Sequence, residues 1–493
     1  MAGTGVVAAG HPLTASAGAD VLRAGGNAVD AALAAMLTSF VAEPLLTGLG
    51  AGGYMLVAAP GREPVLLDFF VSAPGRGADL DRRAELVAAD VFFGDVVQVF
   101  HIGAASCGVY GTPAGICQAA ERFGTMPLAE LARPAIAHAR AGVVINAEQA
   151  YVFEILEPIY ASSPECRELF MPEGRVPRAG DVLRDAPLAD SLERLGAEGA
   201  APFYEGDIGA RVCEVVCDQG GVLTREDLAA YRAEPREPVR VSYRGRQVLT
   251  NPPPSAGGTL LGYALALLDR DPDPPGAPAL VEVMQRAQAE RTPEFLTGLA
   301  EPGFLDRFMA SRLGSTTHLS VLDGDGWACA VTCTNGEGSG VVVPGTGIHV
   351  NNMMGEQDLS PLGFFTHPPG RRLPSMMAPT IVLGTDDAPE LALGSAGSNR
   401  IRSTLLQVIV NVIDRGMSAA EAVDAPRLHF EDGVVYAEPG IDGEALEAAG
   451  HTLAWFRARN LFFGGCQAVE RDPRTGAHAG AGDPRRGGAV VVA

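Results

Sequence analysis

The segment at residues 315–335, STTHLSVLDGDGWACAVTCTN, constrains the fold of this chain most strongly. Two runs with apolar residues at alternate positions stand on either side of an acidic, glycine-rich turn, which is the pattern of a β-hairpin. A three-residue loop at 324–326 predicts that Thr316 lies directly opposite Thr334 at the open end of the hairpin. A two-residue loop would make these threonines diagonal neighbours, still within reach of each other.

Threonines at these two positions have two interpretations. Threonine is favoured in strands and cross-strand threonine pairs are common, so an ordinary sheet explains the pattern. A threonine hydroxyl also becomes a nucleophile once a nearby base takes its proton. Spacing alone leaves both interpretations open.

The composition excludes several classes of function. A net charge of -22 argues against a nucleic-acid partner, because phosphate binding needs basic patches. All 37 basic residues are arginine, which excludes a P-loop lysine, a Schiff base to pyridoxal phosphate and a Ser-x-x-Lys nucleophile. The eight cysteines contain no C-x-x-C motif and the nine histidines no H-E-x-x-H motif, so we expect neither a metal nor another cofactor.

The sequence also predicts a location. No apolar run approaches the roughly 18 residues that a membrane-spanning helix needs. The first residues, MAGTGVVAAGHPLTASAG, have neither the basic region nor the continuous apolar region of a secretory signal. We therefore expect a cytoplasmic protein without a membrane partner.

The chain has a helix-rich front half and a strand-rich back half. Asn27 is placed to cap a helix in AVDAALAAMLTSFVAE, with Asp30 in its first turn and Pro44 after its end. Residues 113–142 also have helical periodicity, whereas alternating strand patterns dominate the back half. No flexible linker separates the halves, so we expect them to share one core.

The sequence GLGAGG at residues 48–53 fits the G-x-G-x-x-G pattern of dinucleotide-binding proteins, and Asp68 follows at a suitable distance. The context is wrong, because a helix precedes these glycines and a strand follows them. We interpret the glycines as positions where backbones pack closely or adopt unusual dihedral angles.

Eight motifs follow one another from about residue 8 to the C-terminus. They are HPLTASAGADVLRAGGNAVDAALAA, GTPAGICQAAERFGTMPLAELARPAIAHARAG, PPPSAGG, TTHLSV, GTGIHVNNMM, APTIVLGT, GSAGSNRI and GAGDPRRGGA. In composition and order they resemble the segments of the gamma-glutamyltranspeptidase family. Several long motifs in one order are far more specific than any single motif.

The resemblance implies an α+β fold, a four-layer αββα sandwich of the N-terminal nucleophile hydrolase type. Members of this family are precursors that cut themselves in front of a threonine. Here the cut would fall between Ser315 and Thr316 and would leave a large-subunit region, 1–315, and a small-subunit region, 316–493. The two fragments would form one intertwined domain as a heterodimer, and further oligomerisation is left open.

The resemblance also implies the catalytic residues. Thr316 would be the nucleophile, and its freed α-amine, with a pKa near 8, would be the base. Thr334 would hydrogen-bond to Thr316 and position it, so that the hairpin brings a nucleophile and its orienting residue together. Gly397 and Ser398 fall where backbone N–H groups form the oxyanion hole, although the family usually has glycine in place of Ser398.

The positions that the resemblance assigns to substrate binding are Phe70, Asn335, Gly336, Met353, Glu356, Ser375 and Met376. Members that use glutathione hold its α-carboxylate with an arginine where this chain has Phe70, and a ring does not replace a bidentate arginine contact. Met353 stands in place of a glutamine and Gly336 in place of an asparagine.

Other substrate-binding positions are closer to the family pattern. Asn335 is adjacent to the lost asparagine, and Glu356 keeps an acid that could pair with an amine. Ser375 matches one of two adjacent serines, and Met376 replaces the other. Arg371 or Arg372 could supply a new partner for a carboxylate.

We therefore expect a self-processing threonine amidohydrolase or acyltransferase that cleaves a gamma-glutamyl or related acyl amide through an acyl-enzyme on Thr316. Hydrolysis and transfer to an amine both fit, with a small amide or peptide as substrate and glutathione metabolism as the family's setting. One alternative is an inactive member that acts as a binding or scaffold protein. Another is an acylase for non-glutamyl amides, which the loss of the arginine favours.

Overall fold

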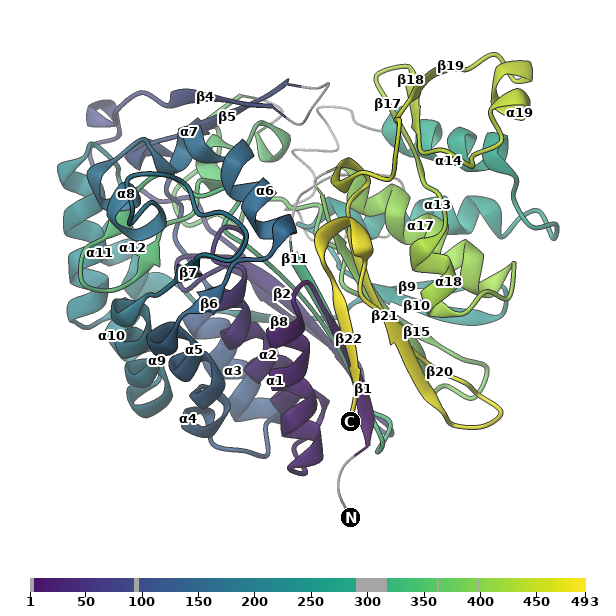
Figure 1. Cartoon of the computed structure of the whole chain (residues 1–493), viewed down its shortest axis with the longest axis horizontal. Coiled ribbons are helices and arrows are strands. Elements are labelled where there is room, and N and C mark those ends of the chain that lie inside the picture. Colours follow the sequence, from purple (N-terminus) through teal and green to yellow (C-terminus); the bar gives the residue numbers. More distant parts are fainter. Residues whose placement is uncertain (1–3, 93–96, 290–316, 361–362, 398) are drawn as a thin grey trace.

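The computed structural model describes residues 4–92, 97–289, 317–360, 363–397 and 399–493. Two β-sheets pack face to face, and helices cover the outer face of each sheet (Figure 1). This is the four-layer αββα sandwich that the family resemblance implies.

The first sheet has seven strands, in the order β22 (Ala489–Val492), β1 (Gly5–Ala9), β11 (Thr317–Asp323), β12 (Ala328–Thr334), β2 (Gly52–Ala58), β3 (Val65–Phe69) and β8 (Glu234–Arg236). The second has six, in the order β21 (His478–Ala481), β20 (Gly465–Arg471), β16 (Pro389–Ala396), β15 (Thr380–Leu383), β10 (Arg246–Thr250) and β9 (Val239–Tyr243). Both sheets combine strands from before and after residue 316, so the two halves share one fold, as predicted.

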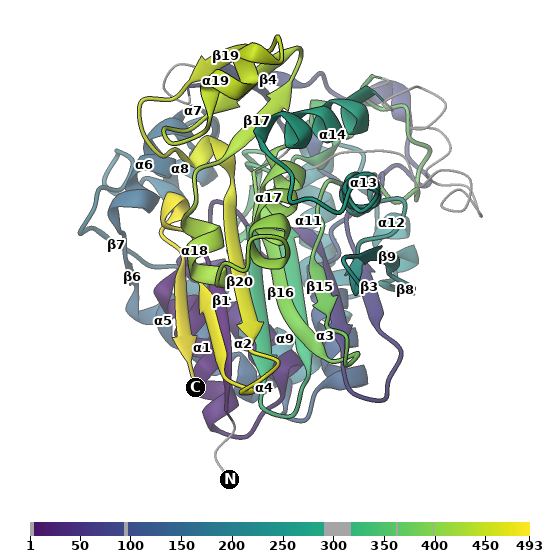
Figure 2. The same cartoon turned by 90° about the vertical axis from the view of Figure 1, so that its right-hand side faces the viewer.

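The outer layer over the first sheet and its flank contain α1 (Pro12–Arg23), α2 (Ala28–Ala42), α3 (Thr112–Phe123), α4 (Leu128–Leu131), α5 (Arg133–Ala141), α6 (Ala147–Ile155), α7 (Glu157–Tyr160), α8 (Pro164–Phe170), α9 (Ala186–Glu198), α10 (Ala201–Tyr204), α11 (Asp207–Asp218) and α12 (Arg225–Ala230). The second sheet is covered by α13 (Ala256–Leu268), α17 (Arg400–Ile413) and α18 (Ala419–Asp424), with α14 (Ala277–Ala289) and α19 (Gly443–Ala448) beyond them (Figure 2).

Smaller elements complete the structure. Four minor sheets are formed by β4 (Val87–Phe92) with β5 (Val97–Ile102), β6 (Val143–Val144) with β7 (Val182–Leu183), β13 (Val342–Val343) with β14 (Ile348–His349), and β17 (Leu428–Glu431), β18 (Val434–Ala437) and β19 (Thr452–Trp455). The 3-10 turns are η1 (Leu80–Arg82), η2 (Ala104–Ser106), η3 (Met353–Gly355), η4 (Gln357–Leu359), η5 (Leu461–Phe463) and η6 (Pro484–Arg486).

The helix α2 shows why the sequence forms this layer. Asn27 and Asp30 make a reciprocal capping box at its start, as their spacing predicts. Every side chain of α2 is buried, because the helix lies between the first sheet and the surrounding helices. The helical pattern at 113–142 is confirmed as three helices, α3, α4 and α5. They are separate because α3 ends before the extended Gly124 and Pro127 caps the start of α4.

The predicted hairpin has the predicted register. Thr317 pairs with Cys333, His318 with Thr332, and the antiparallel ladder continues to the turn. In the turn, the carboxylate of Asp323 accepts hydrogen bonds from the backbone N–H groups of Asp325, at 3.0 Å, and Trp327, at 2.9 Å. The loop therefore contains three residues, while the predicted partner of Thr334, Thr316, lies outside the described residues.

Three of the four glycines at 48–53, Gly50, Gly52 and Gly53, have the packing role expected of them, whereas Gly48 has open space around it. A Cβ atom at Gly50 would lie 2.4 Å from the His349 carbonyl oxygen, and one at Gly53 would lie 2.4 Å from that of Thr332. A strand, β2, follows these glycines. The dinucleotide-binding interpretation is therefore rejected on structure as well as on sequence.

Candidate active site

Thr334 is the last residue of β12 and is 2% exposed. Its Oγ1 accepts a hydrogen bond from the backbone N–H of Gly336 at 2.8 Å, and Gly336 has a φ of +64°. The chain therefore turns sharply as soon as the strand ends. Because the N–H donates to the oxygen, the hydroxyl hydrogen of Thr334 is still available for a second hydrogen bond.

The turn after Thr334 packs against residues 351–356. A Cβ atom at Gly336 would lie 2.0 Å from Asn352 Oδ1 and 2.8 Å from Glu356 Oε1, so a larger residue does not fit. The neighbouring Asn335 donates its side-chain amide to the His349 carbonyl at 3.1 Å. The structure thus brings Thr334, Asn335, Gly336 and Glu356 together, as predicted.

Glu337 extends this cluster with a second acid. Its backbone N–H donates to Asn352 Oδ1 at 3.2 Å, and its Oε2 is buried without a hydrogen-bond partner among the described residues. Burial raises the pKa of Glu337, and a hydrogen bond with Glu356 and the charges of Arg486 and Arg400 only partly oppose that effect. The pKa of Glu337 is therefore higher than that of an exposed glutamate.

Gly397 forms the turn between β16 and α17. Its φ of +120° belongs to glycine, and a Cβ atom here would lie 2.8 Å from Gly464 Cα. The Gly397 carbonyl accepts a hydrogen bond from the backbone N–H of Arg400 at 3.0 Å, which joins the turn to the helix. The other predicted oxyanion-hole residue, Ser398, lies outside the described residues, as do Ser315 and Thr316.

Glu43 is a site residue that sequence reasoning missed. It follows α2, is 8% exposed, and accepts hydrogen bonds from Thr14 Oγ1 at 3.1 Å and Thr317 Oγ1 at 3.5 Å. A Cβ atom at Gly10 would lie 2.1 Å from its Oε1, so the carboxylate needs glycine there. Burial raises the pKa of Glu43 to about 7, against the opposing effect of the two hydrogen bonds. An acid that titrates near neutral pH thus touches the residue after Thr316.

The predicted substrate-binding residues do not all gather in one place. Phe70, 1% exposed, stacks on Tyr54 with ring centroids 5.5 Å apart, and it shares the core between the two sheets with the buried Met353. Met376 packs instead in the core between the second sheet and its helices. Ser375 is buried, and its Oγ accepts a hydrogen bond from the Met377 N–H at 3.0 Å.

Arg372 has a structural role. Its Nε lies 3.2 Å from a carboxylate oxygen of the fully buried Asp68, its Nη1 donates to the Phe70 carbonyl, and its guanidinium lies 4.7 Å from the Tyr231 ring centroid. These groups engage most of the guanidinium, while its Nε makes no hydrogen bond within the described residues. A role for Arg371 or Arg372 in binding a substrate carboxylate stays a prediction.

The comparisons with known proteins agree with this geometry. The family model for gamma-glutamyltranspeptidase matches residues 14–308 and 301–493. The chain belongs to the gamma-glutamyltranspeptidase family. It is 33% identical to the acylase ACY 1 proenzyme of Pseudomonas sp. (strain SE83), over 91% of this chain and 87% of that protein. It is also 33% identical to the glutathione hydrolase proenzyme of Escherichia coli (strain K12), over 98% and 90%.

A solved structure supports the same assignment across the whole fold. The cephalosporin acylase from Bacillus halodurans superposes with a TM-score of 0.85 and 29% identity, covering 99% of this chain and 96% of that one. As a member of this family, the chain is a self-processing amidohydrolase or acyltransferase that acts on amides. The four-layer fold and the family resemblance deduced from the motifs are confirmed.

The described residues lack both a metal-binding cluster and a membrane-spanning helix. They contain no group of three or more histidine, cysteine, aspartate or glutamate side chains arranged to hold a metal ion. None of the described helices combines the length and the apolar character that crossing a bilayer requires.

Proposed function

We propose that Thr316 is the nucleophile of this gamma-glutamyltranspeptidase family member and that the precursor cuts itself between Ser315 and Thr316. Attack of the Thr316 hydroxyl on the Ser315 carbonyl, followed by hydrolysis of the resulting ester, would free the α-amine of Thr316. That amine then accepts the hydroxyl proton when Thr316 attacks a substrate amide. The leaving amine takes the proton, and water or an acceptor amine releases the acyl group.

The register of the hairpin is the observation that carries this proposal. One more residue in the same register would set Thr316 opposite Thr334, whose hydroxyl hydrogen is available to it. Backbone N–H groups at Gly397 and Ser398 would then face the developing oxyanion, which in other enzymes contributes about 3 kcal/mol for each donor.

The fragments 1–315 and 316–493 would remain together after the cut. In the first sheet β11 pairs with β1 on one side, and β12 pairs with β2 on the other, so each fragment supplies strands next to those of the other. The product would be a heterodimer with one continuous core.

For the substrate, we propose an amide with an apolar acyl group in preference to glutathione. Phe70 and Met353 fill the core where a charged α-amino-acid group would need polar partners. Arg372 is engaged by Asp68. The acylase relative, as similar to this chain as the glutathione hydrolase, supports this choice.

Gamma-glutamyl amides are the second candidate. The retained Glu356 and the equal identity to the Escherichia coli glutathione hydrolase favour them. A donor that keeps its α-amine but lacks an α-carboxylate would use Glu356 without needing an arginine at position 70.

The test is intact mass and N-terminal sequencing of the wild-type protein beside Thr316→Ala. Two fragments, the smaller beginning at Thr316 and absent from the variant, establish the nucleophile. The cut protein is then given p-nitroanilides of gamma-glutamic, hexanoic and phenylacetic acids. Cleavage before residue 316 in Thr316→Ala would refute the mechanism, and an uncut wild-type chain would favour the inactive binding protein.

A further inference from the structure

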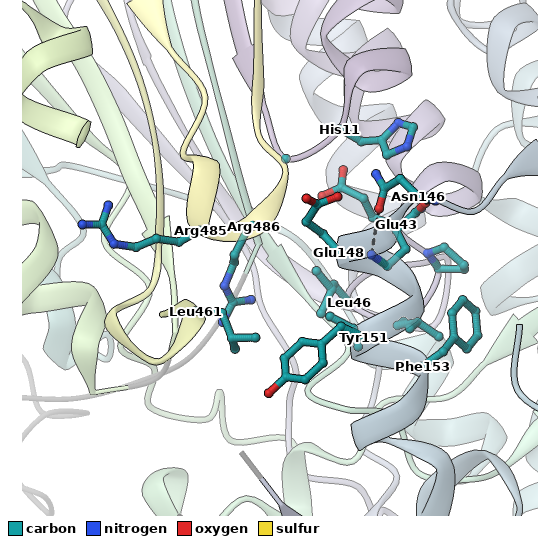
Figure 3. Close-up of a pocket in the computed structure, with 15 residues that line it drawn as sticks. His11, Glu43, Leu46, Asn146, Glu148, Tyr151, Phe153, Leu461, Arg485 and Arg486 are labelled. Atoms are coloured by element: carbon teal, nitrogen blue, oxygen red, sulfur yellow. Dashed lines mark hydrogen bonds between the residues drawn. The ribbon is translucent and has the colours of Figure 1, made fainter. Parts of the chain in front are cut away.

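A pocket with mainly apolar walls opens between α6 and the C-terminal segments that carry η5 and η6 (Figure 3). Its volume is about 100 Å³, which is room for several water-sized groups. Its apolar walls include Leu45, Leu46, Tyr151, Val152 and Leu461. Its charged and titratable members are His11, Glu43, Glu148, Arg485 and Arg486.

The two adjacent arginines of this pocket differ completely in their contacts. Arg485 is fully buried and pairs with Asp483 at 3.3 Å and with Glu438 at 2.5 Å. Arg486 makes no side-chain hydrogen bond or ion pair within the described part of the chain, and its Nε is buried. In Figure 3 Arg485 points away from α6, whereas Arg486 turns toward Leu461. Arg486 as a whole is half-buried, and its Nε is a buried donor without an acceptor among the described residues. A buried donor without an acceptor costs free energy, and a ligand in the pocket that offers an acceptor would remove that cost.

The location of Arg486 connects this pocket to the candidate active site. Its Nη2 lies 3.8 Å from the position of a Cβ atom at Gly397, the predicted oxyanion-hole residue. Glu43, in the same pocket, contacts Thr317, the residue after the proposed nucleophile. None of the seven predicted substrate-binding residues lines this pocket. The pocket is therefore separate from the predicted substrate-binding residues and lies beside Gly397 and Thr317.

Charge in and around the pocket favours an anion. The charges that act on the pKa of Arg486 are those of Arg400, Asp483, Glu337 and Glu43. Glu148 adds an exposed carboxylate to the pocket lining. Asp483 is neutralised by Arg485 and by Arg427, whose Nη2 lies 2.7 Å away. Burial raises the pKa of Glu43 to about 7 and raises that of Glu337, so at a given pH each acid carries less negative charge than an exposed glutamate.

Arg486 keeps its positive charge in this environment. Burial lowers the pKa of its guanidinium to about 10, with the charge of Arg400 acting in the same direction. A group with this pKa is still cationic at pH 7 to 8. Its donors match the geometry of a carboxylate, which guanidinium binds in a bidentate manner.

We propose that Arg486 and the α6 pocket bind a carboxylate attached to an apolar group on the amine side of the amide substrate. The inference rests on the proposed function, because it takes Thr316 as the nucleophile and the residues around Phe70 and Glu356 as the acyl side. An N-acyl derivative of an apolar amino acid is the simplest substrate of this class. The apolar side chain would lie against Tyr151 and Leu461, with the carboxylate on Arg486.

The test is a binding titration that needs no turnover. Saturation-transfer NMR measures the affinity of the purified protein, cut or uncut, for 3-phenylpropanoate and for its neutral analogue 3-phenylpropanamide. We expect the carboxylate to bind at least about 10-fold more tightly, as for a charge-assisted hydrogen-bonded pair. Arg486→Gln should remove that preference, Arg486→Lys should restore part of it, and the exposed-arginine control Arg133→Gln should leave it unchanged.

Equal affinity of the two probes for the wild-type protein overturns the inference, and so does an unchanged preference in a folded Arg486→Gln protein. Tyr151→Ala, at a half-exposed wall position, should weaken both probes to a similar extent, and unaltered binding by that variant also counts against the site. Melting temperatures show whether each variant is folded. If Arg486→Gln is not folded, the relative affinity of the two probes for the wild-type protein tests the inference by itself. Self-cleavage is scored separately, so an uncut chain with carboxylate preference refutes only the proposed function.

Discussion

Replacing Glu43 by glutamine should stabilise the protein at pH 8 and have little effect at pH 4.5. The carboxylate is 8% exposed, and burial raises its pKa from an ordinary value of 4.5 to about 7. Between these pH values the folded chain holds a proton that the unfolded chain has released. The free energy of unfolding therefore falls as the pH rises from about 4.5 to about 7. Above this range the charged Glu43 destabilises the folded protein.

The size of the effect follows from that shift. A difference of about 2.5 pH units, at 1.36 kcal/mol for each unit, corresponds to about 3 kcal/mol. Glutamine keeps the volume of the side chain and an oxygen that accepts from Thr14, but it has no charge to bury. With an unfolding entropy of about 2.1 cal/mol/K for each of 493 residues, about 3 kcal/mol shifts the melting temperature by about 3 °C.

Differential scanning calorimetry from pH 4.5 to 8.5 measures this difference. Both proteins should carry Thr316→Ala, so that self-cleavage does not alter the chain. Glu148→Gln, which removes an exposed carboxylate from the same pocket, is the control and should change the melting temperature by little at any pH. A Glu43→Gln difference that stays constant with pH, or a variant less stable than its parent at pH 8, would refute the argument.

Three further substitutions test other parts of the structure. Thr334→Val should slow self-cleavage at least about 10-fold. The buried Gly336 N–H loses its acceptor and the proposed nucleophile loses its partner, at a cost of about 1–3 kcal/mol. A time course followed on gels that shows cleavage at the wild-type rate would contradict this. Asp68→Asn should destabilise the fold by about 3–5 kcal/mol, since it leaves Arg372 without its buried counter-charge, and an unchanged melting temperature would show that the pair is dispensable. Phe70→Arg should lower the melting temperature without creating activity on gamma-glutamyl p-nitroanilide, because position 70 is 1% exposed in an apolar core. A gain of that activity would show that the site still accepts glutamyl donors.

Local interactions explain why the hairpin could be predicted from sequence. Asp323 caps its own turn through the N–H groups of Asp325 and Trp327, so the loop length is set within five residues of chain. Alternating apolar residues then fix which faces of β11 and β12 are buried. The same locality holds for the Asn27 capping box.

The rest of the site depends on contacts between distant segments. Glu43, Thr317, Gly397 and Arg486 come from the ends of four different elements, and nothing in their local patterns indicates that they meet. The G-S-A-G-S-N-R segment resembles a specific family motif and so points to Gly397 from sequence, and its role in the oxyanion hole stays a prediction. Arg486 also stands in a motif, GAGDPRRGGA, but only the structure shows that Arg485 is paired while the Arg486 side chain has no partner within the described ranges.

The changes around the site form a consistent pattern. Thr334 and Gly397 match the residues that the family resemblance assigns to catalysis, while the position that it assigns to the α-carboxylate arginine holds a stacked, buried phenylalanine. With Phe70 in place of that arginine, the acyl side of the site lacks a positive charge for a substrate carboxylate. In the α6 pocket, Arg486 adds a positive charge whose side chain makes no hydrogen bond or ion pair with the described residues. An enzyme rejects a substrate that would leave polar groups of its site without partners. This arrangement therefore predicts that the protein accepts an apolar acyl group and prefers a leaving amine that carries a negative charge.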